Sequence, residues 1–553
     1  VVGLDPKQYA PKAIRSAITA AKSRLLTPAE YLPRSYFEEV VQRVYERYQQ
    51  LLTESNALDF DDLLLKVVHL FRQNPQILSR YQSRYLHLQV DEFQDTNLVQ
   101  YELMKQLAGK YRNICVVGDP DQSIYSWRFA DLRNILSFEK DYPEAKLVLL
   151  EQNYRSTQTI LDVAQAIIRR NPGRTDKRLF TRRGRGLKVV VHEAYDPDDE
   201  AQFVVDTIAE LVLAGEARPG DCAVMYRTNA QSRALEEAFL QAGLPYRLVG
   251  ATRFYARREI KDVIAFLRVI HNPADDLSLA RILNVPPRGI GRQTLLRLEE
   301  AARAHGASLW WAVQAAVGGE VPLPGRSRNA LAAFHRMVCG WMEARESVPV
   351  LGLMDRVIAK TGYEACLRDG TEEGEDRWNN VQELRGVAAE YGDLPLADFL
   401  ADVALVSDVD NLSDGVDAPT LLTLHSAKGL EFPVVFITGL EEGLLPHIRS
   451  LEDPEALAEE RRLFYVGVTR AKDRLYLTYA FRRARYGGYE PNVPSRFLKD
   501  LPSDLVEGVQ IRSRAMATSW EAGTAVGPAV SRFSAGAVSY THLRAHETRH
   551  DLV

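Results

Sequence analysis

The sequence predicts an α/β fold in which strands and helices alternate to build parallel sheets, with mainly helical domains inserted into them. Short apolar runs separated by amphipathic segments predict the strands, at 86–90, 114–117, 147–150, 187–191, 222–226, 421–424, 434–438 and 475–478. Strands that alternate with helices favour a parallel sheet made of right-handed βαβ units. The interval between the runs at 222–226 and 421–424 is too long for one crossover connection, so we expect an inserted domain there.

The length and composition are those of a large globular protein. The chain has 553 residues, of which 46% are hydrophobic and 26% charged, a length that allows three or four domains. The net charge of −5 excludes a globally basic nucleic-acid coat protein but leaves room for a local DNA-binding groove. The four cysteines lie far apart without metal-ligand spacing, which favours the reducing cytoplasm over a disulfide-rich secreted class. No apolar run reaches the roughly 18 residues that span a bilayer, so no membrane contact is predicted.

Periodicity assigns each part of the chain in turn. Residues 36–45 carry apolar side chains three and four positions apart, which predicts a helix in the N-terminal segment. Residues 539–553 have no helical or strand period, and we interpret them as a translated adaptor rather than a natural disordered tail. The predicted division is a partial helical subdomain (1–57), the rest of a first α/β domain (58–157), the first part of a second α/β domain (158–248), an inserted helical domain (249–416), the second part of the second α/β domain (417–512) and a linker or artefactual tail (513–553).

Adjacent carboxylates, Asp91 and Glu92, end the first predicted strand. Side chains next to each other at a strand end diverge, so one carboxylate can bind Mg²⁺ while the other orients a water molecule. Hydrolysis of a phosphoanhydride needs both functions. Taken alone, the pair is equally consistent with a solvated strand end.

Two further loops place polar and aromatic residues after the next predicted strands. A Gly-Asp-Pro-Asp turn presents the amide of Gln122 at the carboxyl edge of the sheet, where ligands bind in open α/β folds. Tyr125 and Trp127 come next, beside Arg128, and loop aromatics near a cation suit stacking of single-stranded bases. After the third predicted strand, Tyr154-Arg155 again places an aromatic and a cation at the edge of the sheet.

Six segments in a fixed order carry a resemblance to a known family. They are VDEFQDTN, VGDPDQSIYSWRFA, LEQNYRST, YRTNAQSR, LHSAKGLEFPVV and EERRLFYVGVTRAKD. Each alone is only suggestive, but six in order are far beyond chance. The chain resembles the UvrD/PcrA/Rep-type superfamily 1 DNA helicases, most closely their PcrA/UvrD branch, from residue 1 to about residue 500. The resemblance implies two RecA-like parallel-sheet domains, the first incomplete, that hold ATP between them and move along single-stranded DNA.

By this resemblance, the residues of the nucleotide site have separate roles. Asp91 would coordinate Mg²⁺, Glu92 would activate the attacking water, and Gln122 would sense the γ-phosphate. Arg155, from the first domain, and Arg470, as an arginine finger of the second domain, would clamp the γ-phosphate, which ties hydrolysis to domain motion. The nucleotide would also contact Tyr154 through its adenine, Glu431 through its ribose, and Gly429.

The resemblance also implies DNA contacts. Tyr125 and Trp127 would stack on bases with Arg128 in support, and His425 and Lys428 would lie near the DNA-coupling motif. In the inserted domain, the segment VPPRGIG resembles a helix-hairpin-helix turn in which Arg288, Gly289 and Gly291 hold a duplex phosphate, with a plain helix-connecting turn as the alternative. The implied partners are single-stranded DNA, junctions of single and double strands, and repair or replication proteins.

Two basic segments remain open to more than one interpretation. Residues 169–188 hold nine Lys and Arg against one acid, Asp176, which indicates either a DNA-tracking surface or a solvated basic linker. Arg461 and Arg462 adjoin two glutamates, and we interpret them as solvated or paired helix charges.

The family's first motif, a GxxxxGK[ST] phosphate loop, is absent from the sequence. That loop supplies amides and a lysine for the phosphates and a hydroxyl ligand for Mg²⁺. We therefore expect an N-terminally truncated chain from an ATP- and Mg²⁺-dependent 3′–5′ DNA helicase of cytoplasmic repair or replication. One alternative, a helicase subunit of a helicase–nuclease complex, is disfavoured because no C-terminal nuclease domain is evident. The other is a binding module that truly lacks the phosphate loop and does not hydrolyse ATP.

Overall fold

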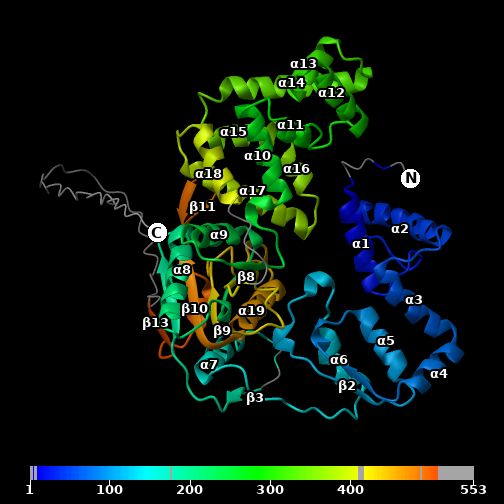
Figure 1. Ribbon diagram of the computed structural model, residues 1–553. Coiled ribbons are helices and arrows are strands. Elements are labelled where there is room, and N and C mark those ends of the chain that lie inside the picture. Colours follow the sequence, from blue (N-terminus) through cyan, green and yellow to red (C-terminus); the bar gives the residue numbers. More distant parts are fainter. Residues whose placement is uncertain are drawn as a thin grey trace, which may run out of the picture. The chain divides into compact units, whose positions relative to one another are not determined.

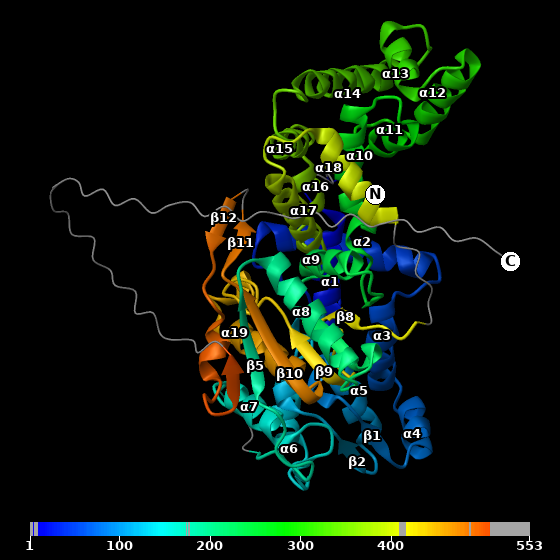
Figure 2. The same ribbon diagram turned by 60° about the vertical axis from the view of Figure 1, so that its left-hand side comes forward.

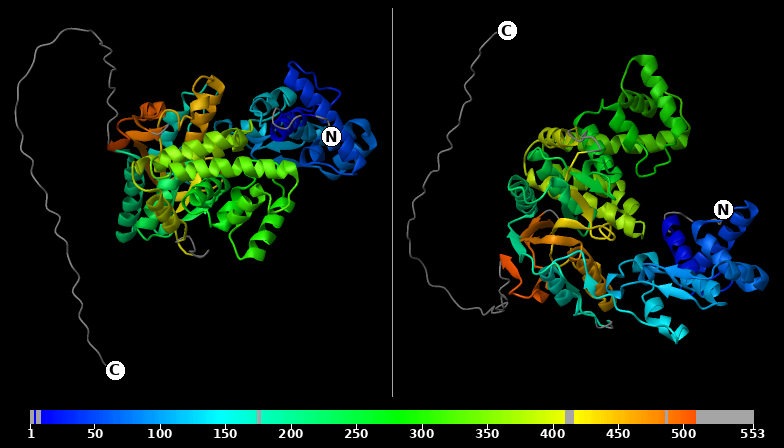
Figure 3. Two further views of the ribbon diagram at one scale, coloured as in Figure 1. Left: turned by 90° about the horizontal axis from the view of Figure 1, so that it is seen from above. Right: turned by 60° about the horizontal axis from the view of Figure 1, so that its bottom comes forward.

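The computed structural model describes residue 4 and residues 9–172, 174, 177–408, 416–485 and 488–508, without the side chains of 128, 136, 405–408, 484, 485 and 488–490. The chain divides into two compact units, Val1–Gln510 and Ile511–Val553. All described residues belong to the first unit, so the predictions for 513–553 and 539–553 lie outside the described residues. Figures 1 to 3 show the ribbon from several directions.

Two helices, α1 (Pro11–Ser23) and α2 (Tyr36–Glu54), open the described chain, which confirms the helix predicted over 36–45. Their apolar stripes face each other and bury Ile14, Val41 and Tyr45. Lys22, at the end of α1, is fully buried, and its ammonium lies 2.6 Å from Asp59 and 3.0 Å from Asp62. This charge cluster fastens α1 to the N-terminal end of the third helix, α3 (Phe60–Gln73).

The first parallel sheet has two strands among the described residues, β1 (Leu88–Val90) and β2 (Ile114–Val116), as the sequence predicts. Phe93 is buried between the sheet and the helices, with its ring 5.5 Å from that of Phe138. The helices near this sheet are α3 (Phe60–Gln73), α4 (Pro75–Arg84), α5 (Leu98–Ala108) and α6 (Arg133–Asp141).

The prediction of a third strand in this sheet, at residues 147–150, is wrong. These residues form no strand, and Leu147 and Leu150 are 65% and 77% exposed. A strand needs a neighbour for its backbone hydrogen bonds, and within the described residues none pairs with this segment. Only the next residues pair, as β3 (Gln152–Asn153) beside β4 (Phe180–Thr181).

The second sheet has seven strands in the order β13-β5-β10-β9-β6-β8-β7, and every neighbouring pair is parallel. The strands are β5 (Val189–Ala194), β6 (Cys222–Tyr226), β7 (Arg247–Val249), β8 (Thr420–Thr423), β9 (Phe432–Ile437), β10 (Ala471–Ala480) and β13 (Val506–Gly508). The five strands predicted from apolar runs are therefore confirmed. Strands that are far apart in sequence, such as β5, β10 and β9, lie side by side (Figure 2).

Helices cover both faces of the second sheet. They are α7 (Gln158–Ile168), α8 (Pro197–Leu213), α9 (Ser232–Gln241) and α19 (Pro454–Val468). Phe436 of β9 packs into a cluster with α8 and α9, whereas Ile437, the next residue, faces Gly467 of α19. Because successive residues of a strand point to opposite faces, α19 lies across the sheet from α8 and α9. A Cβ on Gly467 would lie 2.4 Å from a Leu424 methyl carbon, so glycine permits this close approach.

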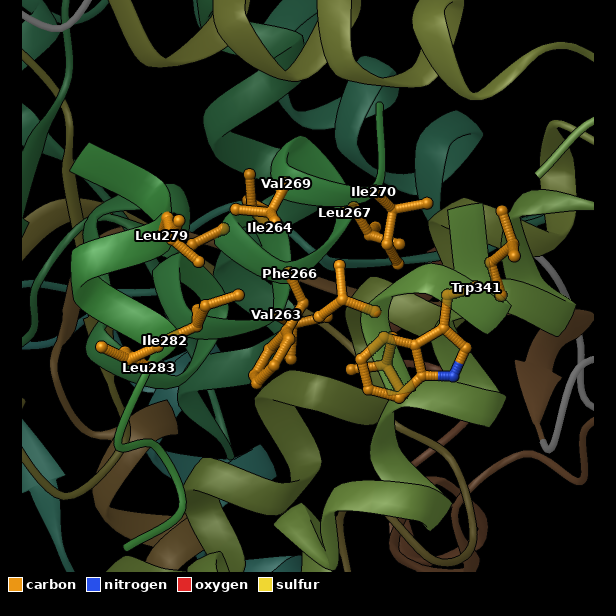
Figure 4. Close-up of a cluster of buried hydrophobic side chains, with 14 of the residues drawn as sticks. Val263, Ile264, Phe266, Leu267, Val269, Ile270, Leu279, Ile282, Leu283 and Trp341 are labelled. Atoms are coloured by element: carbon orange, nitrogen blue, oxygen red, sulfur yellow. The ribbon is translucent and has the colours of Figure 1, made fainter. Parts of the chain in front are cut away.

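The segment between β7 and β8 is helical, as predicted. Its helices are α10 (Arg258–His271), α11 (Asp276–Ile282), α12 (Arg292–His305), α13 (Leu309–Gly318), α14 (Gly325–Ala344), α15 (Val350–Thr361), α16 (Tyr363–Leu367), α17 (Glu372–Glu390) and α18 (Leu396–Asp408). Nearly every residue of α10 from Glu259 to Ile270 is buried, and its apolar side chains meet Trp341 of α14 in one core (Figure 4). Helices α11 to α14, drawn in green, lie above the strands of the second sheet in Figure 1. The domain limits at 249 and 416 stay predictions.

Two short strands, β11 (Arg482–Arg485) and β12 (Gly488–Pro491), pair antiparallel beside the second sheet. Across the described ranges, every helix is too short or too polar to cross a membrane.

Candidate nucleotide and DNA site

Asp91 and Glu92 lie directly after β1, where the chain turns sharply. The backbone of Glu92 adopts a φ of +50°, in the left-handed region, and its amide donates a hydrogen bond of 2.8 Å to the Asp91 carboxylate. Both residues are exposed. A non-glycine residue in this conformation is strained, and such strain concentrates at functional sites. The turn therefore presents two accessible carboxylates at the carboxyl end of the strand.

Gln94 connects these carboxylates to the turn after β2. Its side chain is fully buried. The side-chain amide nitrogen donates a hydrogen bond of 2.6 Å to the Glu92 carboxylate, and the side-chain amide oxygen accepts one of 2.9 Å from the backbone N–H of Asp119. A Cβ on Gly118 would lie 2.7 Å from that oxygen, so the glycine makes room for the contact. Gln94 is not among the residues predicted from the sequence, where the only signal for it is an amide within a run of carboxylates.

Asp91 fits the role of a Mg²⁺ ligand. Mg²⁺ keeps several waters and takes one or two carboxylates together with substrate phosphates. Within the described part of the chain, no cluster of three or more His, Cys, Asp or Glu residues could hold a metal by itself. The residues present thus suit a metal that arrives with a nucleotide.

Gln122 is held by an acidic turn. Its side-chain amide donates a hydrogen bond of 2.9 Å to the Asp119 carboxylate, which also accepts one of 3.0 Å from the backbone amide of Asp121. The ammonium of Lys177 contacts Asp119, and Arg174 binds Asp121 through two bonds of 2.8 and 2.6 Å. Burial alone would raise the pKa of Asp121, but Arg174 and Lys177 lower it below its ordinary value.

Both cations belong to the basic connector, residues 169–188, for which the sequence left two interpretations. A third member, Arg183, bonds the carbonyl of Lys472 at 3.3 Å and pairs with Asp473 at 2.8 Å. Arg174 and Lys177, each 15% exposed, are therefore neither solvated nor available to track DNA in this structure, whereas Arg183 is paired but exposed. Other cations of the connector, such as Arg185, are exposed.

Arg155 and Ser156 bond residues in or next to β9 and β10 of the second sheet. The guanidinium of Arg155 donates 2.5 Å to Glu431 and 3.2 Å to the carbonyl of Thr469, and the hydroxyl of Ser156 donates 2.6 Å to the carbonyl of Ala471. The sequence predicts that Arg155 belongs to the first domain, and its side-chain hydrogen bonds reach residues of the second sheet's surroundings, Glu431 and Thr469. Hydrogen bonds from Lys472 and Arg155 lower the pKa of Glu431 to about 2.

Arg470 is almost completely buried, at 3% exposure. Its guanidinium is held by the carbonyls of Val466 (3.0 Å) and Leu430 (3.3 Å) and by the hydroxyl of Thr469 (3.1 Å). Within the described chain no carboxylate lies at salt-bridge distance from it. Burial, followed by the nearby charge of Arg155, lowers the pKa of Arg470 to about 10. A buried cation without an anion is costly, so this position suits a ligand that supplies negative charge.

Two predicted nucleotide contacts are accessible. The side chain of Tyr154 is 79% exposed, as a ring that stacks on a ligand requires. Gly429 has a φ of +85°, so the turn before β9 needs glycine there.

Lys428 brings the two sheets together. The side chain of Lys428 is only 7% exposed. Its ammonium contacts Asp95 and donates a hydrogen bond of 2.8 Å to the carbonyl of Gln122. It also lies 5.2 Å from the centre of the Tyr125 ring. Burial raises the pKa of Asp95 and outweighs the opposing effect of Lys428.

Tyr125, Trp127 and His425 form an aromatic cluster. The Tyr125 and Trp127 ring centres are 6.1 Å apart, those of Trp127 and His425 are 6.4 Å apart, and the Tyr125 hydroxyl donates 3.3 Å to the His425 carbonyl. Trp127 is 44% exposed. The structure thus unites three predicted DNA contacts; the side chain of Arg128 lies outside the described residues.

The aromatic cluster lines a cavity of about 570 Å³ whose other walls carry charge. Acidic residues come from α17 and α19, including Glu372, Asp376 and Glu460. Arg227 pairs with Glu460 at 2.7 Å. Burial and the charge of Arg227 lower the pKa of His447, another lining residue, to about 4.

The turn before α12 keeps its arginine inside. The guanidinium of Arg288 donates 2.9 Å to the carbonyl of Ile282 and 2.7 Å to that of Val285 and lies over the ring of Phe334, and burial lowers its pKa to about 10. Gly289, with a φ of +81°, is exposed, as is Gly291. In this structure the Arg288 side chain stabilises the turn. That the backbone amides of the two glycines bind a duplex phosphate remains a prediction.

In the described chain, Arg461 and Arg462 do not pair with the glutamates next to them in sequence; each contacts a residue from another part of the chain. Arg461 contacts Asp500, which fits a paired helix charge. Arg462 donates 2.7 Å to the carbonyl of Ser123, in the loop after β2. Glu459 accepts 3.1 Å from the amide of Ser126 in the same loop. Helix α19 is thus bonded to the loop that carries Tyr125 and Trp127.

Comparison with known proteins identifies the family. The UvrD/REP helicase N-terminal domain matches residues 2–143, and the UvrD-like helicase C-terminal domain matches residues 148–314 and 335–482. The chain belongs to the UvrD-like helicases. The resemblance seen in the six sequence segments is therefore confirmed, and so is the α/β fold with RecA-like sheets.

Several named UvrD-like helicases are similar over most of this chain. The ATP-dependent DNA helicase PcrA of Bacillus subtilis is 44% identical over 529 residues, which cover 93% of this chain and 71% of the relative. PcrA of Staphylococcus aureus strain Mu50 is 43% identical over 518 residues, covering 91% and 70%. PcrA of Staphylococcus epidermidis matches at the same identity and coverage.

Proposed function

We propose that this chain is the larger part of an ATP-dependent DNA helicase that moves 3′ to 5′ along single-stranded DNA and unwinds duplexes in cytoplasmic repair or replication. Its PcrA relatives are named ATP-dependent DNA helicases, which supports the reaction. The observation that carries the proposal is Arg470, a buried guanidinium beside Arg155 that the described chain leaves without an acidic partner. A preorganised cation of this kind suits the charge that develops during phosphoryl transfer.

Each residue then has a chemical task. Bound ATP and Mg²⁺ would supply the phosphoanhydride and a metal that neutralises its charge. Asp91 would hold the Mg²⁺, and Glu92 would take the proton of the attacking water. Arg470 and Arg155 would stabilise charge on the phosphoryl group, and the exposed Tyr154 ring would stack on the base of the nucleotide.

Lys428 supports a connection between the nucleotide and DNA sites. It contacts Asp95 and the carbonyl of Gln122 on one side and the ring of Tyr125 on the other. Tyr125 in turn bonds the backbone of His425. A shift of Gln122 would therefore change the aromatic cluster that we propose binds single-stranded DNA.

A segment with a phosphate loop would complete this site. The sequence contains no GxxxxGK[ST] loop. Val117, directly after β2, and the unpaired segment with Leu147, Val148 and Leu150 expose large apolar side chains. Exposed apolar side chains that gather on one surface usually mark a place where other polypeptide binds. We infer that further chain, carrying the phosphate loop, covers this sheet in the active enzyme.

The test joins the N-terminal segment of Bacillus subtilis PcrA that precedes the aligned region to this chain, which we call the completed protein. We expect ATP hydrolysis that single-stranded DNA stimulates, and unwinding of a duplex with a 3′ tail but not of one with a 5′ tail. Glu92→Gln in the completed protein is the matched control and should abolish both activities. A completed protein that binds DNA but hydrolyses no ATP would favour the binding module instead.

A further inference from the structure

The basic connector, residues 169–188, joins the two sheets through side-chain contacts at both ends. Asn171 donates 2.9 Å to the carbonyl of Ala458 in α19, and Arg170 pairs with Asp500 at 3.2 Å. Farther along, Arg174 and Lys177 reach the acidic turn after β2. The connector is thus fastened to elements of the second sheet at its start and to the first sheet in its middle.

The contacts with the acidic turn are sheltered and specific. The side chains of Arg174 and Lys177 are each 15% exposed, and that of Asp121 is 6% exposed. Arg174 meets Asp121 as a two-bond fork, and Lys177 lies 3.2 Å from Asp121 in addition to its contact with Asp119. Charge-assisted bonds of this kind are stronger and more directional than exposed ion pairs.

Asp119 relays this contact to Gln122. One oxygen of its carboxylate faces the Asp121 amide and Lys177, and the other accepts the side-chain amide of Gln122 at 2.9 Å. Through its backbone amide, Asp119 also bonds Gln94, which holds Glu92. The position of one carboxylate therefore bears on both residues that we propose act on the γ-phosphate and the attacking water.

We propose that Lys177, with Arg174 beside it, is a positioning residue for the nucleotide site, because it holds Asp119 so that Gln122 faces the γ-phosphate. Since the connector that carries Lys177 is also bonded to the second sheet, the position of Asp119 then depends on where that sheet lies. The inference rests on the proposed function. Because Lys177 touches Asp119 rather than the reacting atoms, its effect passes through the turn. The connector is then a second mechanical link between the sheets, distinct from Lys428.

The first test needs no nucleotide and uses residues 1–553 as they are. Hydrogen exchange of the peptide that spans the turn is measured by mass spectrometry for the wild type and Lys177→Met. We expect exchange at the Asp119, Asp121 and Gln122 amides to become about tenfold faster or more, the scale of a lost charge-assisted hydrogen bond. Lys177→Arg should stay near the wild type.

Arg185→Met is the matched control, because it removes a cation from the same connector at an exposed position for which the described residues include no ion pair. It should leave exchange in the turn unchanged. Asp119→Asn supplies a second variant if Lys177→Met does not fold; it keeps the shape of the side chain, weakens the Lys177 contact and should speed exchange in the same peptide. Unchanged exchange in whichever of these two variants folds would overturn the proposal.

The second test uses the completed protein. Lys177→Met should lower kcat of DNA-stimulated hydrolysis by roughly 10- to 100-fold, the range expected when a reacting group is displaced by about 1 Å, while affinity for single-stranded DNA without nucleotide stays the same. Lys177→Arg should restore most of kcat. Normal kcat in a variant whose turn exchanges faster would also overturn the positioning role. Loss of hydrolysis in the wild-type completed protein is a different result, since it would refute the proposed function itself.

Discussion

Arg470 shows at the scale of one residue how burial and charge point to a reaction. In the completed protein, Arg470→Ala should lower kcat on the order of 10³-fold, the scale of arginine-finger effects. Affinity for single-stranded DNA without nucleotide should barely change, because the hydrogen bonds of Arg470 go to Val466, Leu430 and Thr469 and not to the aromatic cluster. Steady-state hydrolysis and a fluorescence binding titration measure the two quantities. Weaker DNA binding with normal turnover would contradict the finger assignment.

Trp127 separates a stacking role from a core role. Its ring is 44% exposed, so Trp127→Ala should leave the melting temperature nearly unchanged. A lost base-stacking contact should cost about 1–3 kcal/mol of single-strand affinity, and unwinding by the completed protein should fall further than binding. Thermal melting and DNA titration of the same variant decide the matter. A melting temperature lower by about ten degrees with normal affinity, the signature of a core substitution, would place Trp127 in the core instead.

At the scale of elements, the inserted helices depend on a core around α10. Trp341 is 4% exposed and its ring lies 6.1 Å from that of Phe266, edge to face (Figure 4). Trp341→Ala should lower the free energy of unfolding by about 3–5 kcal/mol. Leu296→Ala, at a position that is 45% exposed on α12, is the matched control and should change it by less than about 0.5 kcal/mol. Urea denaturation followed by circular dichroism gives both values, and equal losses would argue against this core.

Elements were predictable where their cause is local. The apolar period that predicted α2 and the apolar runs that predicted β6 and β9 depend only on neighbouring residues, and these elements are present. The run at 147–150 is as apolar as those of β6 and β9 but forms no strand. A strand requires a hydrogen-bonding neighbour, and the composition of the run does not reveal whether one is present.

Whole-molecule stability should depend on pH through His447. Its pKa is about 4 in the folded protein against an ordinary 6.5, so between these values the unfolded chain binds a proton that the folded chain does not. Stability from this residue is therefore complete above about pH 6.5 and is lost as the pH falls towards 4, by at most about 1.4 kcal/mol per pH unit. Urea denaturation at pH 7, 6 and 5 should show a steeper decline for the wild type than for His447→Gln. Parallel declines would mean that His447 titrates normally.

The activity of the molecule should depend on a segment beyond the two sheets. Residues 1–553 alone should hydrolyse ATP negligibly, because the sequence lacks the amides, lysine and hydroxyl of a phosphate loop. The completed protein should show DNA-stimulated hydrolysis in the same assay. Robust turnover by residues 1–553 that Glu92→Gln abolishes would refute this dependence.

The sequence by itself determined the family, the α/β class and the residue types of the candidate site, since six ordered segments and the apolar periodicity depend only on the order of residues. Only the tertiary structure decided which of those residues meet. Gln94 joins Glu92 to Asp119, and Arg155 bonds the second sheet. Lys177 binds Asp119 from a connector that the sequence left open as either a DNA-tracking surface or a solvated linker. Such contacts join residues from different elements, so they depend on how the strands are ordered and the helices packed, and local patterns carry no record of that.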